Sequence, residues 1–132
     1  MYKVTEEFVN GIFVKKIQVE TKYISVTLLS YGAIIADLQT KDFLGNFESV
    51  VLGFDSIEKY FNDDAYFGAN VGRVAGRISG GSFKLGNNTY KTDVNDKVNT
   101  LHGGFNGISK RNFDVMYVED GSYLNVIFST IQ

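Results

Sequence analysis

The chain has 132 residues, of which 44% are apolar and 14% aromatic, a composition typical of a folded domain with an apolar core rather than of a disordered chain. Its formal net charge of −2 excludes the basic surface that general nucleic-acid binders and binders of anionic membranes need. The sequence contains no cysteine, which excludes disulfides and thiolate metal sites and agrees with a reducing compartment.

The N-terminal sequence MYKVTEEFVNG carries acidic residues and no apolar run, so it does not have the pattern of a secretory signal peptide. No apolar stretch reaches the roughly eighteen residues that a membrane-spanning helix needs. We therefore expect a soluble, cytoplasmic protein that binds neither nucleic acid nor membrane.

Apolar and polar residues alternate with period two along much of the chain, and the alternating runs are rich in β-branched and aromatic side chains, which predicts strands. In chain order the predicted strands are YISVTLLSYG from Tyr23, AIIADLQT from Ala33, SVVLG from Ser49, NFDVMYVED from Asn112 and YLNVIFST from Tyr123. Turn residues around Gly86 and around Gly121 predict two hairpins. The spacing of strands and turns predicts an all-β fold, an antiparallel β-sandwich or part of one.

A single short helix is predicted at DSIEKYF, because Asp55 and Glu58 have the spacing of an N-cap residue and the third helical residue. Two acidic clusters, NDD at residues 62–64 and VED at residues 118–120, are expected to be solvated turn charges rather than a catalytic pair.

The segment FGANVGRVAGRISGG, residues 67–81, repeats glycine every four residues and places Arg73 and Arg77 between the glycines. Four interior glycines would cost a helix roughly 4 kcal/mol, and the segment has neither of the common phosphate-loop patterns. We therefore expect a turn-rich segment whose backbone passes close to another group, with both arginines on the same side. Each arginine could bond loop carbonyls or a carboxylate, or the two could grip a hydroxyl-rich ligand.

His102, in NTLHGGFNG, is the only histidine, so any mechanism that needs an imidazole from this chain must use it. Gly103 and Gly104 predict a turn with space beside it, where a ligand could approach, and Asn99 supplies a second hydrogen-bonding side chain. The alternative is a glycine-rich turn with a solvated histidine. No spacing typical of metal ligands and no Gly-x-Ser-x-Gly elbow occurs, so we predict neither a metal site nor a cofactor.

The run YFGANVGRVAGRISGGSFKLGNNTYKTDVNDKVNTLHGGFNGISKRNF resembles the N-terminal half of the aldose 1-epimerases, or galactose mutarotases. That family carries Gly-x-x-x-Gly-Arg-x-Ala-Asn-Arg-Ile, then a Gly-x-Phe/Tyr hairpin, then Asn-x-Leu-His-Gly-Gly. The earlier run LLSYGAIIADLQTKDFLGNFESVVLGFDSIEKYF is also similar to the family, so the resemblance covers nearly the whole chain. It implies the galactose mutarotase-like supersandwich, a large antiparallel β-sandwich, and an isomerase that interconverts the α and β anomers of free aldoses such as galactose and glucose.

The resemblance also assigns roles to individual residues. Arg77 and His102 match the residues that bind and orient the sugar, and His102 is the catalytic candidate, orienting the substrate and assisting acid–base transfer. Gly76 stands at a substrate-binding position where the family usually has asparagine, so one hydrogen bond to the sugar would be missing. Asn99 and Arg73 match supporting positions.

Family members are more than twice as long as this chain, and their second histidine, sugar-binding aspartate and glutamate base follow in the additional part. The resemblance therefore implies that residues 1–132 form the N-terminal part of a single aldose 1-epimerase domain. Because mutarotation needs both an acid and a base, we expect catalysis to depend on the missing half, with this chain either truncated or completed by a separate C-terminal partner chain. The alternative is a non-catalytic carbohydrate-binding or degenerate remnant of the family.

Overall fold

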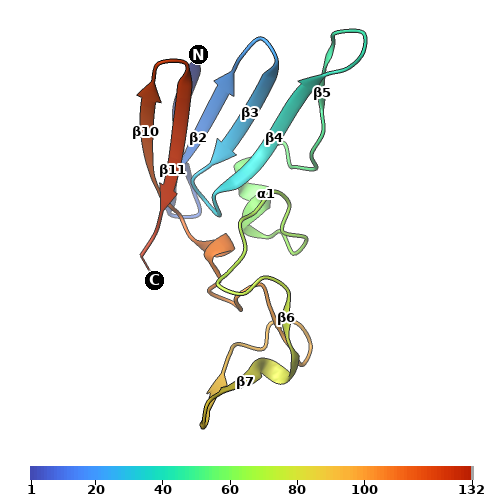
Figure 1. Ribbon diagram of the computed structural model, residues 1–132, viewed down its shortest axis with the longest axis vertical. Helices are drawn as coiled ribbons and strands as arrows, with labels where there is room; N and C mark the ends of the chain where they lie inside the picture. The colour runs from blue at the N-terminus through green and yellow to red at the C-terminus, as the bar shows by residue number, and fades with distance from the viewer. Residues whose placement is uncertain (132) are drawn as a thin grey trace.

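The structure, a computed structural model, describes residues 1–131; Gln132, the last residue of the predicted domain, lies outside the described residues. Its main element is an antiparallel five-stranded sheet in which neighbouring strands follow one another along the chain (Figure 1). The strands are β1 (Tyr2–Val9), β2 (Ile12–Glu20), β3 (Ile24–Leu29), β4 (Ile34–Lys41) and β5 (Phe47–Ser49). A short helix, α1 (Ile57–Phe61), follows the sheet.

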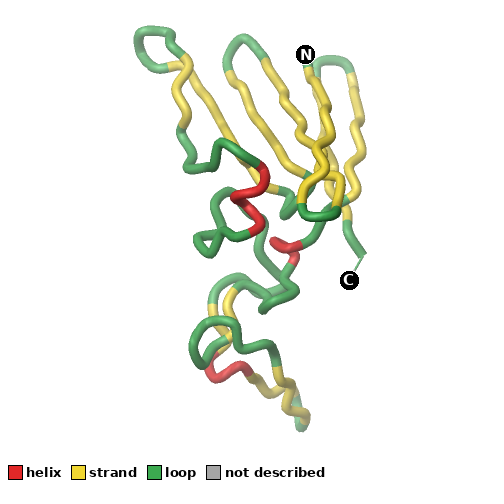
Figure 2. The backbone as a smooth tube through the Cα atoms, turned by 180° about the vertical axis from the view of Figure 1, so that it is seen from behind, coloured by secondary structure: helices red, strands yellow, loops and turns green. Residues whose placement is uncertain are grey.

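Beyond α1 the chain leaves the sheet and forms a smaller lobe, which Figures 1 and 2 show extending away from the sheet. This lobe, residues 70–107, contains β6 (Arg77–Ile78), a 3₁₀ turn (Ser79–Gly81), the hairpin β7 (Ser82–Leu85) with β8 (Asn88–Lys91), and β9 (Thr100–Leu101). The chain then returns through a 3₁₀ turn (Ile108–Lys110) to the hairpin β10 (Asp114–Asp120) with β11 (Tyr123–Ser129). All strand pairs are antiparallel, which confirms the predicted fold class.

Most of the predicted strands and both predicted hairpins are present. The runs from Tyr23, Ala33, Asn112 and Tyr123 contain β3, β4, β10 and β11. Leu85 pairs with Asn88 across the Gly86 turn, and Asp120 pairs with Tyr123 across the Gly121 turn. Local alternation and turn chemistry were sufficient to locate these elements because both act between residues close in sequence.

Two predictions about the sheet edge and the helix were wrong. The strand expected from Ser49 onward instead ends there: β5 is an edge strand, and the chain leaves it to reach α1. Asp55 does not cap the helix, because the N-cap position is Ser56 and no side chain caps it. The Asp55 carboxylate instead accepts a hydrogen bond from Lys59 Nζ at 2.6 Å, one helical turn away.

The hairpin of β1 and β2 was not predicted. Its turn, Asn10-Gly11, has positive φ at both residues, 49° and 83°, as the two-residue type I′ turn requires. Asn-Gly is the strongest short-range hairpin signal, but the charged residues on the exposed face of β1 obscured the alternation on either side.

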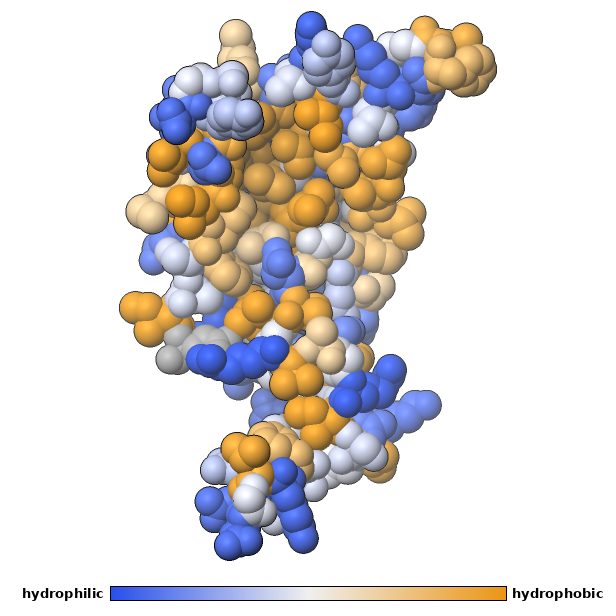
Figure 3. Space-filling view, viewed as in Figure 1, coloured by the Kyte–Doolittle hydropathy of each residue, from blue (hydrophilic) through white to orange (hydrophobic). Residues whose placement is uncertain are grey.

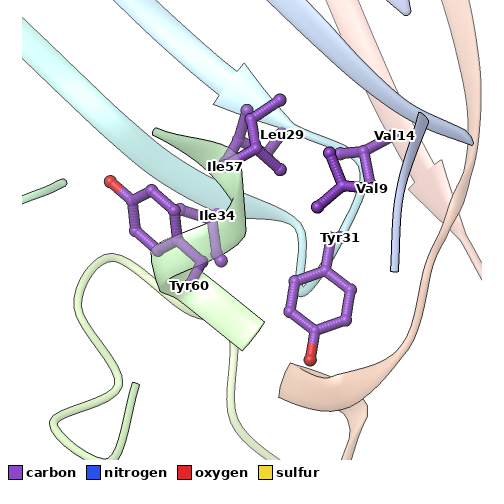
Figure 4. Packing of buried hydrophobic residues seen from close by; sticks show 7 residues of the cluster. All are labelled: Val9, Val14, Leu29, Tyr31, Ile34, Ile57 and Tyr60. Atoms are coloured by element: carbon purple, nitrogen blue, oxygen red, sulfur yellow. The ribbon is translucent and has the colours of Figure 1, made fainter. Parts of the chain in front are cut away.

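The buried core lies on one face of the sheet, where α1 covers it (Figure 2). Figure 4 shows the seven residues of the cluster, Val9, Val14, Leu29, Tyr31, Ile34, Ile57 and Tyr60. A helix of five residues is not stable alone, so α1 depends on burying Ile57 and Tyr60. Each such burial contributes about 1.5–3 kcal/mol relative to an exposed side chain. No helix among the described residues is long and apolar enough to cross a bilayer.

The opposite face of the sheet is also apolar but only partly covered. The hairpin β10–β11 packs over part of it, with the rings of Tyr2 and Tyr117 stacked at 5.5 Å between centroids. Asn112 anchors this hairpin, since its amide donates to the Phe13 carbonyl at 2.8 Å and accepts from the Ser30 hydroxyl at 2.7 Å. Beside the hairpin, hydrophobic side chains gather on the surface (Figure 3). An apolar sheet face of this kind is typical of the inner face of a sandwich.

We expect this exposed sheet face to cause self-association at high concentration. Phe8 and Phe13, each 62% exposed, contact one another on it. The double substitution Phe8→Ser with Phe13→Ser should shift the concentration-dependent sedimentation profile toward the monomer. Phe43→Ser is the matched control, because Phe43 is 94% exposed on the separate turn after β4. An equal effect of the control would show that association does not use the sheet face.

Candidate functional site

The short strand pair β6–β9 brings Gly76, Arg77 and His102 together. Arg77 pairs with Leu101 in register, so the residues on either side, Gly76 and His102, lie next to each other. The His102 backbone N–H donates to the Gly76 carbonyl at 3.0 Å, and the Gly76 N–H donates to His102 Nδ1, also at 3.0 Å. The three residues that the sequence assigned to sugar contact therefore form one cluster.

The hydrogen bond from Gly76 fixes the tautomer of His102. Because a backbone N–H can only donate, Nδ1 must be unprotonated, and the neutral imidazole carries its proton on Nε2. The ring therefore offers an N–H donor on the edge away from Gly76. Such a donor can bond a hydroxyl or a ring oxygen of a sugar.

Asp96 orients Arg77 and leaves part of its guanidinium available. Arg77 Nε donates to Asp96 Oδ2 at 2.6 Å, while the Arg77 side chain remains 59% exposed. Within residues 1–131 the two terminal nitrogens of Arg77 make no hydrogen bond. An exposed ion pair contributes at most about 1 kcal/mol to stability, so its main effect here is to direct a planar array of donors.

Asn99 supports this arrangement through the turn that carries Asp96. The backbones of Asp96 and Asn99 bond to each other in both directions, at 3.0 and 2.8 Å. The Asn99 side-chain oxygen accepts from the Gly80 N–H at 3.2 Å, which ties this turn to the 3₁₀ turn after β6. Asn99 thus holds the partner of Arg77 rather than His102 itself, and its supporting role in binding stays a prediction.

The glycines of the repeat have two different kinds of surroundings. At Gly68 a Cβ atom would overlap the Ile35 carbonyl oxygen, so close packing requires glycine there, whereas at Gly72 it would lie 3.1 Å from the flexible end of the Ile108 side chain. Gly76 and Gly80 have φ of 80° and 64° and nothing within 4 Å of an added Cβ. The segment is turn-rich, as predicted, and its open side is at Gly76.

The glycines after His102 form a turn, as predicted, and Gly103 lines a hollow of about 350 Å³. The turn is closely packed at both Cα positions: a Cβ on Gly103 would overlap the Gly72 carbonyl oxygen, and one on Gly104 would collide with the Asp93 side chain. Both residues have positive φ, so they form a tight turn that packs against the protein's own chain. Open space next to a glycine of this site also occurs at Gly76.

Arg73 and Arg77 have different surroundings. Arg73 is exposed and lines a hollow of about 350 Å³ together with Phe83 and Arg111, whereas neither Arg77 nor His102 lines it. Within residues 1–131 the Arg73 side chain makes no hydrogen bond or ion pair, so its supporting role stays a prediction. A second hollow, of about 390 Å³ between the sheet and α1, is lined by no predicted site residue.

Three residues near His102 were not identified from the sequence. The Tyr66 ring lies edge-on to the His102 ring, with 4.8 Å between centroids. The Asn95 side chain accepts from the Leu101 N–H at 2.7 Å and donates to the Leu101 carbonyl at 2.9 Å. Asp63, predicted to be a solvated turn charge, is instead only 9% exposed and bonds the backbone around Tyr66. Among the described residues, no three His, Asp or Glu side chains gather to hold a metal ion.

Comparison with known proteins agrees with this geometry. Residues 15–131 match the family model described as "Aldose 1-epimerase". The chain belongs to the aldose 1-epimerase family. It is similar to a galactose mutarotase from Mus musculus, with 46% identity over 76% of this chain and 29% of that protein. It is also similar to a probable aldose 1-epimerase from Arthroderma benhamiae, with 35% identity over 92% of this chain and 30% of that protein.

The solved structure of a galactose 1-epimerase from Lactobacillus acidophilus has the same fold. The TM-score is 0.81 at 27% sequence identity, and the match covers 97% of this chain and 37% of that one. The chain therefore spans about a third of the length of the aldose 1-epimerases that it matches.

Tyr66 is an uncharged side chain beside His102. Burial, and then the negative charges of Asp64, Asp63 and Asp96, raise the pKa of its phenol above the ordinary value. The hydroxyl therefore stays protonated at neutral pH. The Nε2–H of His102 and the terminal nitrogens of Arg77 are donors that suit the oxygen atoms of a sugar.

Proposed function

We propose that this chain supplies the sugar-orienting part of an aldose 1-epimerase site, in which Arg77 and His102 hold an aldose while its α and β anomers interconvert. The observation that carries the proposal is the hydrogen bond from the Gly76 N–H to His102 Nδ1, since it leaves Nε2–H free to donate, and His102 directly follows Leu101, the residue that pairs with Arg77. Galactose is the first candidate, because relatives at 41–46% identity are galactose mutarotases. Glucose is the second.

Interconversion of anomers requires two proton transfers. A base removes the proton of the anomeric hydroxyl while an acid protonates the ring oxygen, and the bond between the anomeric carbon and the ring oxygen breaks. The carbonyl then rotates, and the reverse transfers close the ring to the other anomer. His102 and Arg77 can bond and orient the hydroxyls, which contributes through positioning.

The remaining acid and base belong to the part of the family domain that this chain does not span. Residues 1–132 then act as the N-terminal part of a single domain, which a C-terminal partner chain would complete. The exposed apolar sheet face supports this proposal, because it offers the surface on which a second layer could pack. A cytoplasmic location stays a prediction, for which the cysteine-free sequence is the support.

The test measures binding and catalysis separately. We expect galactose to shift the His102 ring resonances in a saturable way in the chain alone. We expect magnetisation exchange between the anomers of ¹³C-labelled galactose to accelerate only after adding a polypeptide with the C-terminal two thirds of the Lactobacillus acidophilus relative. Binding without acceleration in either case would favour the non-catalytic carbohydrate-binding alternative, and the absence of any shift would overturn the sugar site itself.

Gly76→Asn should strengthen sugar binding. The position has room for a side chain, and asparagine tolerates positive φ better than most residues. One added hydrogen bond contributes about 0.5–1.5 kcal/mol, so we expect roughly two- to tenfold tighter binding in a chemical-shift titration with galactose. Gly76→Ala is the matched control, since it has a similar backbone cost without the amide. Equal affinities of the two variants would show that the open space at Gly76 does not face the sugar.

A further inference from the structure

Tyr66 is held in an unusual backbone conformation directly against His102. Its φ is 59°, a left-handed value that is strained and uncommon for a bulky residue. The two rings meet at an interplanar angle of 64°, in an edge-to-face arrangement that aromatic pairs prefer. Such strain persists only where the surroundings impose it, so the contacts that hold Tyr66 are informative.

A buried carboxylate imposes this conformation. Asp63 Oδ1 accepts from the Ala65 N–H at 2.7 Å, and Asp63 Oδ2 accepts from the Phe67 N–H at 2.7 Å. These two donors immediately precede and follow Tyr66. Hydrogen bonds from backbone N–H groups to a charged carboxylate are among the stronger ones in proteins. Together they can offset the strain at Tyr66.

Lys110 lies over Tyr66 as well. Its Nζ is 5.6 Å from the centroid of the Tyr66 ring and donates to the Asp63 carbonyl at 3.3 Å. The lysine therefore contacts both the strained residue and the loop that strains it. Because the Asp63 carboxylate bonds the backbone on both sides of Tyr66 and Lys110 lies over its ring, Tyr66 has little freedom to move away from His102.

Asn95 lies between Tyr66 and the strand that precedes His102. Its side chain partly opposes the upward shift of the Tyr66 phenol pKa. The same Asn95 side chain bonds both the N–H and the carbonyl of Leu101, the residue before His102. Tyr66 thus contacts His102 through its ring, and the strand beside it is held by Asn95.

We propose that Tyr66 is a positioning residue for His102, and that Asp63 is the group that fixes Tyr66. The ring edge of Tyr66 restricts rotation of the imidazole, so Nδ1 stays on the Gly76 N–H and Nε2–H stays directed at the ligand. This inference rests on the proposed function for its consequence in sugar binding, but the positioning itself is a property of the sugar-free protein.

The decisive measurement is the pair of ¹⁵N ring resonances of His102 without sugar. In the native chain we expect the pattern of a single tautomer with its proton on Nε2. Tyr66→Leu removes the ring edge and should move both resonances toward the average of the two tautomers. Tyr66→Phe keeps the ring edge and should retain the native pattern, so this pair of variants separates the ring from the hydroxyl.

Sugar affinity supplies the second readout. We expect Tyr66→Leu to weaken galactose binding about tenfold, the loss of one oriented hydrogen bond, and Tyr66→Phe to stay within about twofold of the native chain. An equal loss in both variants would mean that the Tyr66 hydroxyl binds the sugar directly, which overturns a positioning role. An unchanged ¹⁵N pattern in Tyr66→Leu would overturn it as well.

The variant Asp63→Asn provides a second test that remains available if the Tyr66→Leu chain does not fold. The asparagine side chain keeps one acceptor oxygen and loses the other, so it should release one of the two backbone bonds beside Tyr66. We expect the His102 ring resonances to move in the same direction as in Tyr66→Leu, by a smaller amount. Unchanged His102 resonances in Asp63→Asn would contradict the inference. Because the ¹⁵N measurements need no sugar, they can succeed where galactose does not bind, which distinguishes failure of this inference from failure of the proposed function.

Discussion

Replacing Gly103 by alanine is expected to destabilise the protein by about 3 kcal/mol or more, among the largest effects that a single methyl group can have. The added Cβ would overlap the Gly72 carbonyl oxygen, and the backbone there has a φ of 91° that alanine rarely adopts. Gly103 directly follows His102, so the change should also disturb the position of His102. Urea unfolding followed by tyrosine fluorescence measures the loss.

Gly121→Ala is the matched control for this prediction. Gly121 also has a positive φ, 58°, but nothing lies within 4 Å of an added Cβ. Its cost should therefore be only that of the left-handed backbone, about 1–2 kcal/mol. If the two variants lost the same free energy of unfolding, the close approach of Gly103 to Gly72 would not be the cause.

Replacing Arg77 by alanine is expected to weaken galactose binding by roughly ten- to a hundredfold, the loss of one or two charge-assisted hydrogen bonds. The free energy of unfolding should change by less than about 1 kcal/mol, because the ion pair with Asp96 is largely exposed. Arg77→Lys keeps the charge but not the planar donors, so it should bind with intermediate affinity. Chemical-shift titration with galactose, together with urea unfolding, measures both quantities.

Lys84→Ala controls for loss of a positive charge in the same lobe. Lys84 is exposed on β7 and takes part in no ion pair within residues 1–131, so we expect no change in affinity. Native affinity of the Arg77→Ala chain would remove Arg77 from the sugar site. A large fall in its stability would instead give the pair with Asp96 a structural role.

Sequence patterns predicted the parts of this fold that depend on neighbouring residues. Alternation located β3, β4, β10 and β11, and turn glycines located two hairpins, because strand faces and tight turns are determined over a few residues. The register that places Arg77 opposite Leu101 could not be found in this way. The resemblance implied only that Arg77 and His102 bind the same sugar, and it gave no strand register.

The contacts that decide the site geometry could not be predicted, because they join residues far apart in sequence. Asp63 has the same side chain whether it is solvated or buried, and only the fold makes it an acceptor for the backbone around Tyr66. Gly103 similarly gives no local sign that its neighbour will be the Gly72 carbonyl. Residue type predicted which groups carry chemistry, and packing determined which of them meet.

The lobe that carries Arg77 and His102 has a consequence for the order of folding. Its defining bond, from Gly76 to His102, spans 26 residues, whereas the bond from Ser30 to Asn112 that seats the last hairpin spans 82. Loop-closure entropy makes the longer connection about 1 kcal/mol more costly before any contact compensates it. The lobe of residues 70–107 can therefore assemble while Ser30 and Asn112 are still apart.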